Sequence, residues 1–185
     1  MNNYKSIVIS GPPYSGKTTL AETLARDLNV PMYYAGGELR STYEKMYPRK
    51  EIPFEEFWRK MSIEENRKFD EELKPKFESN NLVADSRYTS YLDKTKCLLV
   101  FVNADIGTRY LRALLRGEFK GATKERVIAV LKRREEDEVK TGVQMFGVDY
   151  RDPRQYHIVM NSDLLSTRQE ADAIIGVYKA KTSHL

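Results

Sequence analysis

The chain has 185 residues, 41% of them hydrophobic and 31% charged, and its formal net charge is +4. This length suits one domain with a substantial core, and the hydrophobic content excludes a globally disordered chain. No apolar run approaches the roughly 18 residues of a membrane-spanning helix, and the N-terminal residues are typical of a strand rather than a signal peptide. The single cysteine, Cys97, excludes an internal disulfide and lies in an apolar run, as expected for a buried thiol in a cytoplasmic protein.

The first predicted elements surround a loop that contains glycine. Residues 5–10 form a short apolar run rich in Ile and Val, which predicts a buried strand. The loop at 11–16 follows, and leucines at helical spacing predict a helix over 17–29. Residues 30–35 are expected to form a second strand, and a pair of glycines opens a helix over 36–47.

The loop contains the strongest motif of the sequence. Gly11, Gly16, Lys17 and Thr18 match G-x-x-x-x-G-K-[ST], with an apolar strand before the motif and a helix after it. In such loops the backbone N–H groups point at an anion, the lysine reaches the β and γ phosphates, and the hydroxyl ligates Mg²⁺. We therefore expect a bound nucleotide and Mg²⁺ as cofactors. The predicted nucleotide-binding residues are Gly11, Tyr14, Ser15, Gly16, Lys17, Thr18 and Thr19.

The other residues of this loop are unusual for such a motif. Pro12 and Pro13 lack N–H groups, but the donors that surround phosphate come mostly from positions 15–19, so the prolines only stiffen the start of the loop. Tyr14 is strained if its φ is positive. If its φ is negative, its ring simply lies over the loop or over a partner.

The rest of the chain continues the alternation of strands and helices. A polar segment at 48–76 is interpreted as two short helices, the second ending at Pro75. Further strands are predicted at 81–85, 96–102 and 157–161, and further helices at 105–117, 123–140 and 167–180. This alternation, with apolar strands that suit burial on both faces, favours an α/β fold with a five-stranded parallel sheet flanked by helices.

Three more motifs accompany the loop: Gly-Gly-x-x-Arg at 36–40, Asp-x-Arg at 85–87 and Arg-x-x-x-Glu at 134–138. In order and spacing, and over nearly the whole chain, the sequence resembles the short archaeal-type cytidylate kinases, a family of P-loop nucleoside monophosphate kinases. The resemblance implies the P-loop kinase fold with two insertions. These would be a nucleoside-monophosphate-binding part at 36–76 and a lid at 117–148, with the core formed by 1–35, 77–116 and 149–185.

The resemblance also implies roles for the matching residues. Gly36 and Arg40 would open the acceptor-binding part, where the arginine binds the acceptor phosphate. Asp85 and Arg87 would complete the acceptor site. The catalytic residues that the resemblance implies are Lys17, Arg112, Arg116 and Arg134.

The residue types themselves support these roles. Arg112 and Arg116 share one helix face with Arg109, and guanidinium groups suit phosphate oxygens. Arg109 is left out of the predicted site, because we expect it to form a surface contact or a salt bridge. Asp85 ends a predicted strand at the edge where open α/β sheets bind ligands, so it could hold Mg²⁺ or orient the acceptor. The structural alternatives are solvated helix positions for Arg40 and Arg134 and a cap of the next turn for Asp85. Arg87 could instead pair with Asp85 or with a helix end.

Three positions depart from the family pattern. Tyr14 and Ser86 each stand where a glycine is usual, and Thr141 stands where the family has a further arginine. Lys140 is adjacent to Thr141, but a lysine ammonium group cannot form the two parallel hydrogen bonds to phosphate that an arginine guanidinium group forms. Because losing one arginine that stabilises the transition state can cost orders of magnitude in rate, these departures leave room for slow turnover or for another acceptor.

The predicted reaction is phosphoryl transfer from ATP to CMP or dCMP with Mg²⁺. One alternative is a kinase for another acceptor, such as AMP, UMP, dTMP or a nucleoside. The other is a nucleotide-binding regulatory or RNA-associated protein with weak or no turnover. We expect small-molecule nucleotides as partners, neither a membrane nor a nucleic acid, and a monomeric protein.

Overall fold

The structure is a computed structural model that describes residues 4–49 and 51–182. The strands in these ranges are β1 (Ser6–Ser10), β2 (Met32–Tyr34), β3 (Leu82–Asp85), β4 (Cys97–Asn103) and β5 (Ile158–Asn161). The helices are α1 (Lys17–Leu28), α2 (Ala35–Met46), α3 (Phe54–Lys60), α4 (Ile63–Ser79), α5 (Ile106–Leu115), α6 (Lys124–Phe146) and α7 (Thr167–Thr182), and a 3₁₀ turn covers Pro153–Gln155. None of these described helices is both long enough and apolar enough to cross a membrane.

The strands form one sheet in the order β2-β3-β1-β4-β5, and every pairing is parallel. Ile7 of the central strand β1 lies opposite Val83 of β3 and Leu98 of β4. The predicted α/β fold with a five-stranded parallel sheet flanked by helices is therefore confirmed. Because the carboxyl ends of parallel strands meet at one edge, the loop after β1 and Asp85 at the end of β3 lie next to each other.

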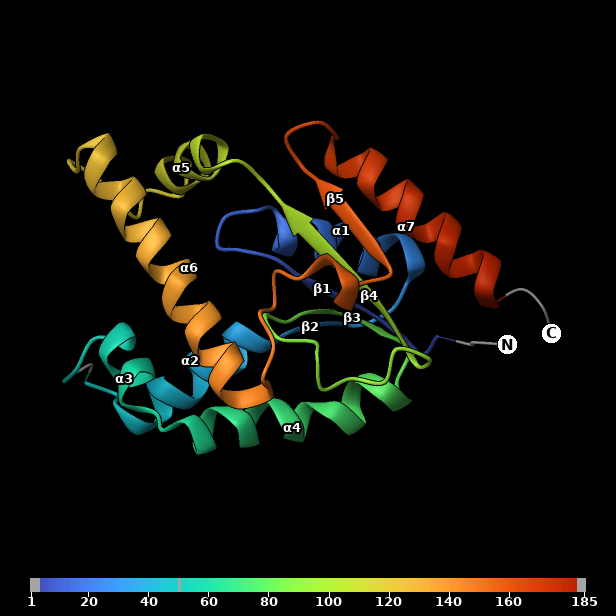
Figure 1. Cartoon of the computed structure of the whole chain (residues 1–185), viewed down its shortest axis with the longest axis horizontal. Coiled ribbons are helices and arrows are strands. Elements are labelled where there is room, and N and C mark those ends of the chain that lie inside the picture. The colour runs from blue at the N-terminus through green and yellow to red at the C-terminus, as the bar shows by residue number, and fades with distance from the viewer. Residues whose placement is uncertain (1–3, 50, 183–185) are drawn as a thin grey trace.

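Alternate residues of the strands enter two different cores. Ile7 packs with Leu24 of α1 and Ile174 of α7 on one face of the sheet. Val8 packs with Phe77 of α4 on the other face. Figure 1 shows α4 below the sheet and α7 above it. Burial on both faces explains why the sequences of these strands are continuous apolar runs. The thiol of Cys97 in β4 is buried, as predicted.

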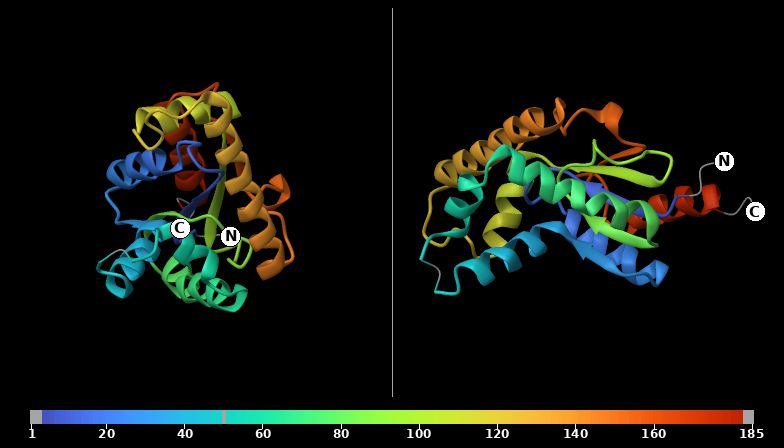
Figure 2. Two further views of the ribbon diagram at one scale, coloured as in Figure 1. Left: turned by 90° about the vertical axis from the view of Figure 1, so that its left-hand side faces the viewer. Right: turned by 90° about the horizontal axis from the view of Figure 1, so that it is seen from below.

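Helix α6 crosses the carboxyl ends of the strands. It packs on α5 and on α4, and Figure 1 shows it running from α5 at the top of the view down to α4 at the bottom. Figure 2 shows α3, α5 and the start of α6 at the same end of the molecule. The helix continues past its predicted end at residue 140 and stops at Gly147, whose φ is 70°. Leu131 of α6 packs in one cluster with Tyr14, so α6 faces the loop after β1.

Helix α4 corrects one prediction. The sequence favoured a short helix that ends at Pro75, whereas the helix continues through this proline. Ser62 and Glu65 form a capping box at its start, and Leu73 and Phe77 are buried against the sheet. A proline inside a helix removes one backbone donor and costs about 3 kcal/mol. The capping box and the burial of two large side chains offset that cost.

Candidate active site

The loop between β1 and α1 needs glycine at both ends. Gly11 has a φ of 150°, and a Cβ atom there would lie 2.1 Å from the carbonyl oxygen of Val102. Gly16 has a φ of 105° and caps the start of α1. Other residues adopt such φ values only with strain. The first N–H groups of α1, which begins at Lys17, have no acceptor within the helix and are suited to an anion.

Lys17 bends back over the loop. Its Nζ atom donates a hydrogen bond to the Pro12 carbonyl oxygen at 2.9 Å. Burial lowers the pKa of this ammonium group. Two carboxylates that raise its pKa and two guanidinium groups that lower it are close enough to act on it: Asp85, Glu138, Arg87 and Arg134. Three of these four are predicted site residues, so the structure brings them together around the loop lysine.

Thr18 and Asp85 form a pair beside Lys17. The Thr18 hydroxyl donates to Asp85 Oδ2 at 2.6 Å, and Asp85 is buried at the end of β3. A hydroxyl and a carboxylate are the oxygen ligands that Mg²⁺ prefers. No group of three or more His, Cys, Asp or Glu side chains in the described ranges could hold a metal by itself. The pair therefore fits a magnesium ion whose other ligands are phosphate oxygens and water.

Tyr14 has the positive φ that the sequence left open, at 64°. Its ring packs in an apolar cluster with Ala113 of α5 and Leu131 of α6. Its hydroxyl donates to Glu118 Oε2 at 2.5 Å. Burial first, and then the Glu118 carboxylate, raise the pKa of Tyr14, so the phenol keeps its proton. The strained backbone is thus accompanied by contacts that join the loop to the predicted lid.

Arg112 binds the main chain of the loop. Its Nη1 atom donates to the Ser15 carbonyl oxygen at 2.7 Å and to Ser162 Oγ at 2.8 Å, and its Nη2 atom donates to the Ser162 carbonyl oxygen at 3.1 Å. Ser162 Oγ in turn donates to the Ser15 carbonyl oxygen at 2.8 Å. This network holds the loop against the segment after β5. The catalytic role of Arg112 stays a prediction.

A cavity of about 260 Å³ adjoins the end of the loop. Gly16 and Thr19 line it on the loop side, and Arg112 of α5 and Arg116, which follows α5, line it opposite. Arg116 is exposed, and its guanidinium carbon lies 5.6 Å from the ring centroid of Tyr14. Further lining comes from Ser162 and Leu165, between β5 and α7, and from Thr167 and Glu170 in the first turns of α7. The predicted donor loop therefore borders a second compartment that could hold the rest of a nucleotide.

Glu138 ends the Arg-x-x-x-Glu motif at 134–138, but the sequence did not predict it as a site residue. This carboxylate is 1% exposed, and its Oε1 atom lies 3.1 Å from Arg87 Nη2 and 3.2 Å from Arg134 Nε. Its Oε2 atom accepts a hydrogen bond from Tyr150 at 3.4 Å. One buried carboxylate thus holds two predicted site arginines together. Its position one helical turn after Arg134, on the apolar stripe that includes Leu131, was the signal available in the sequence.

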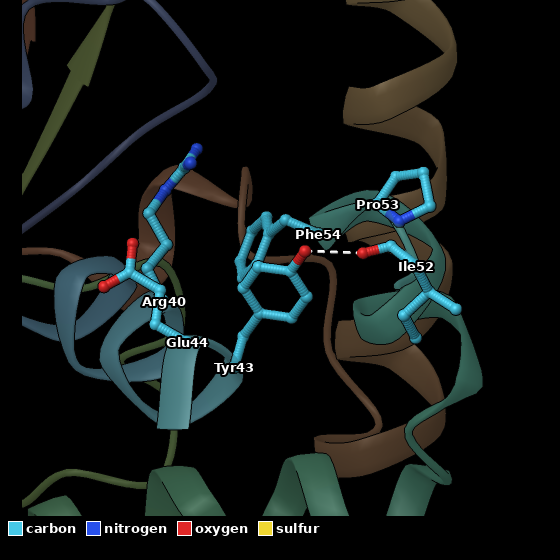
Figure 3. A pocket seen from close by; sticks show the side chains of 6 residues that line it. All are labelled: Arg40, Tyr43, Glu44, Ile52, Pro53 and Phe54. Carbon is cyan, nitrogen blue, oxygen red and sulfur yellow. Dashed lines mark hydrogen bonds between the residues drawn. The ribbon is translucent and has the colours of Figure 1, made fainter. Parts of the chain in front are cut away.

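Arg40 lies further out, on α2. It lines a cavity of about 320 Å³ with residues of α2 and of the segment before α3, and its guanidinium carbon lies 4.5 Å from the Phe54 ring centroid. Figure 3 shows the hydrogen bond from the Tyr43 hydroxyl to the Ile52 carbonyl oxygen, with Phe54 near it and Arg40 farther away on the opposite side of the two rings. Gly36 lies in the first turn of α2, where an added Cβ atom would come within 3.0 Å of the Tyr34 ring.

The structure also shows the surroundings of Arg109, Thr141 and Ser86. Arg109 is buried and forms an ion pair with Glu135 at 2.7 Å, as expected for a salt-bridged arginine. The Thr141 hydroxyl donates to the Asp137 carbonyl oxygen of its own helix at 2.8 Å, so it supplies no cation to the site. Ser86, which stands in place of a glycine, is 1% exposed and fits without a positive φ.

Comparison with known sequences places this arrangement among nucleotide kinases. Residues 6–164 match the model of the cytidylate kinase-like family. The cytidylate kinase of Sulfurisphaera tokodaii is 29% identical over 176 residues, which cover 93% of each chain. The cytidylate kinase of Archaeoglobus fulgidus is 29% identical over 178 residues, which cover 95% of each chain. The resemblance to short archaeal cytidylate kinases is confirmed.

Comparison with solved structures gives the same fold. An uncharacterized protein from Eubacterium ventriosum aligns with a TM-score of 0.68 at 16% identity, covering 95% of this chain and 98% of that one. Shikimate kinase from Acinetobacter baumannii aligns with a TM-score of 0.59 at 14% identity, covering 97% and 95%. The P-loop kinase fold is therefore shown by structure as well as by sequence. Since the family match covers well over half of its length, this chain belongs to the cytidylate kinase-like family and is an ATP-dependent phosphotransferase of the nucleoside monophosphate kinase type.

Proposed function

We propose that this kinase transfers the γ-phosphoryl group of Mg-ATP to CMP or dCMP. A phosphate oxygen of the acceptor would form a bond to the γ phosphorus while the bond from that phosphorus to the β–γ bridging oxygen breaks, and ADP would leave. The main support is the meeting of Lys17, the Thr18–Asp85 pair and two arginines at one edge of the sheet. The family and the names of its relatives supply the acceptor class.

On the donor side, the start of α1 and Lys17 would hold the β and γ phosphates. Bound Mg²⁺ would supply positive charge that neutralises the phosphate oxygens, with Thr18 and Asp85 as its protein ligands. Ser15 supports this assignment, because its buried Oγ atom has no hydrogen-bond partner among the described residues. A buried hydroxyl without a hydrogen-bond partner destabilises the folded protein. A phosphate oxygen bound in the loop would accept a hydrogen bond from it and remove that cost.

On the acceptor side, Arg87 and Arg134 would bind the phosphate of the nucleoside monophosphate. Glu138 already fixes both guanidinium groups near Lys17. Arg40 would approach from α2, in the proposed acceptor-binding part at 36–76, and Gly36 would let the chain turn closely there. Several cations around a transferring phosphoryl group are what this chemistry requires, since it needs little covalent help.

The proposed lid at 117–148, which includes α6, would close over the phosphates next to α5. Arg112 and Arg116 would then surround the transferring group, with exposed Arg116 making the larger movement. Closure would exclude water, so that ATP is not simply hydrolysed. A cytoplasmic monomer is the setting we propose for a kinase of free nucleotides.

The deciding experiment measures ADP production from Mg-ATP with CMP, dCMP, UMP, AMP, GMP or dTMP added singly. We expect turnover with CMP or dCMP that disappears when EDTA removes Mg²⁺. Lys17→Ala should lower the rate at least about a hundredfold, because it removes a charge at the transferring group. Lys5→Ala is the matched control, since it removes an exposed lysine far from the loop.

Each result separates the alternatives. Turnover with another acceptor would keep the fold and mechanism but refute the cytidylate assignment. ATP binding without ADP production from any acceptor would favour a nucleotide-binding protein of low turnover. The observation that favours this second candidate is Thr141, whose hydroxyl is turned to its own helix and brings no positive charge.

A further inference from the structure

Glu170 is a buried acid with an unexplained oxygen. It is 2% exposed in the first turns of α7, and its Oε1 atom has no hydrogen-bond partner within the described part of the chain. Burying a carboxyl oxygen without a partner costs folding free energy. Such a cost is typical of a side chain whose partner arrives with a ligand.

Helix capping does not account for this side chain. The N–H of Ser166 and its hydroxyl lie within hydrogen-bond distance of Gln169 Oε1, at 2.9 Å and 3.0 Å. Those contacts cap the start of α7 with residues other than Glu170. Burial raises the pKa of Glu170, and the positive charge of Arg112 acts in the opposite direction. In either protonation state, one of its oxygens can accept a hydrogen bond.

Glu170 also lines the cavity of about 260 Å³ beside the loop. Leu115 and Leu165 line the same cavity and are 88% and 37% exposed. The rest of the lining, apart from the Tyr14 ring and Gly16, is polar or charged, so the cavity combines apolar surface with polar groups that can fix the orientation of a ligand. Gly16 and Thr19 join this cavity to the phosphate loop, so a nucleotide whose phosphates lie in the loop could place its base here.

We propose that Glu170 selects the donor base by accepting a hydrogen bond from its exocyclic amino group. This inference rests on the proposed use of ATP as the donor in the P-loop. The 6-amino group of adenine is a donor without a charge, and a buried acceptor with no partner in the protein is complementary to it. Glu170 is then a specificity residue that touches the base and takes no part in the phosphoryl transfer.

The test compares ATP with purine riboside 5′-triphosphate, which lacks only the 6-amino group, by calorimetric titration without acceptor. The wild-type protein should bind ATP roughly tenfold more tightly, as expected for one hydrogen bond to an otherwise unpaired acceptor. Glu170→Met keeps the length of the side chain and removes the acceptor, so its preference should fall below about twofold. Glu170→Gln retains a carbonyl oxygen and should keep most of the preference.

A second measurement excludes a structural role. Glu170→Met should raise the unfolding temperature by about 2–4 °C, because it removes a buried oxygen that lacks a partner. Asp172→Ala is the matched control, since it removes an exposed acid from the same helix and should leave the base preference unchanged. A lower unfolding temperature for Glu170→Met would make Glu170 a stabilising residue and count against the proposal.

The outcomes separate this inference from the proposed function. Equal affinity of the wild type for both nucleotides overturns the role of Glu170, even if a variant does not fold. An unchanged preference in Glu170→Met overturns it as well. If neither nucleotide binds, or if Lys17→Ala binds both as well as the wild type does, the proposed donor site fails and the inference fails with it.

Discussion

The donor and acceptor halves of the site are built in different ways. In the donor half, comprising the loop at 11–16 and the start of α1, the main chain is the chief component. Arg112 and Ser162 both donate to the Ser15 carbonyl oxygen, and Lys17 donates to the Pro12 carbonyl oxygen. In the acceptor half, side chains from separate elements meet. Arg87 follows β3 and Arg134 lies on α6, and Glu138 holds both.

This difference has a physical consequence. A site made of backbone groups keeps its geometry when a distant side chain changes, because the loop and helix fix it. A site made of paired side chains loses its geometry when the shared partner is removed, because a buried charge is then left without compensation. Substitutions in the acceptor half should therefore affect acceptor use and stability while donor binding persists.

The largest effect is expected from Glu138→Gln. Removing this charge frees Arg87 and Arg134, so the KM for CMP should rise about 10–100-fold, since a misplacement of about 1 Å can cost that much. The free energy of unfolding should fall by roughly 3–5 kcal/mol, the usual effect of breaking a buried pair. ATP affinity should stay within about twofold. Steady-state kinetics, urea unfolding and ATP titration measure the three quantities.

Glu136→Gln is the matched control for that substitution. Glu136 lies on the same helix but is exposed, so its removal should change unfolding by less than about 0.5 kcal/mol. If Glu138→Gln weakened ATP binding as much as it raised the KM for CMP, the two halves would not be separable in the way that the structure indicates.

A pH effect is expected from Asp70 on α4, in the acceptor half. Burial raises the pKa of Asp70 to about 7, although the charge of Arg87 lowers it. The folded protein then keeps a proton that the unfolded chain loses near pH 4, so stability decreases as pH rises from about 4 to 7. Asp70→Asn removes this effect. It should gain roughly 2–4 kcal/mol of stability relative to the wild type at pH 8, and little at pH 4.

Urea unfolding of both proteins at the two pH values measures that difference. Glu71→Gln, which changes an exposed acid of the same helix, should show no pH-dependent gain. A gain for Asp70→Asn of the same size at both pH values would mean that packing, and not the proton, is responsible.

The fold and the donor half could be predicted from the sequence because their signals are local. A contiguous motif between an apolar strand and a helix specifies the loop, and the alternation of elements specifies the sheet. The motif at 134–138 contains Glu138, but its role could not be identified from the same kind of signal. It lies among other charged residues, and only the packing of α6 against the loop after β3 shows that its carboxylate is buried between Arg87 and Arg134.

Tyr14 shows the same limit within the donor half itself. Its positive φ was one of two alternatives, and the motif alone could not choose between them. The positive φ of Tyr14 is accompanied by contacts with residues about 100 positions away in the sequence. The ring packs with α5 and α6, and the hydroxyl donates a hydrogen bond to Glu118. Likewise, Pro75 was expected to end a helix, but burial of its neighbours outweighs the local preference.

The smallest effect is expected from Tyr14→Phe, which removes the hydrogen bond to Glu118 and keeps the ring in its cluster. The loss should be about 1 kcal/mol, or roughly 2–4 °C in the unfolding temperature. Backbone amides at 117–122 should exchange hydrogen faster, while those of α1 stay protected. Tyr110→Phe removes a hydroxyl from the same cluster without touching the loop, and it should leave exchange at 117–122 unchanged. Unchanged exchange in Tyr14→Phe would mean that ring packing alone joins the loop to the proposed lid, and that the Tyr14–Glu118 hydrogen bond contributes nothing to the link.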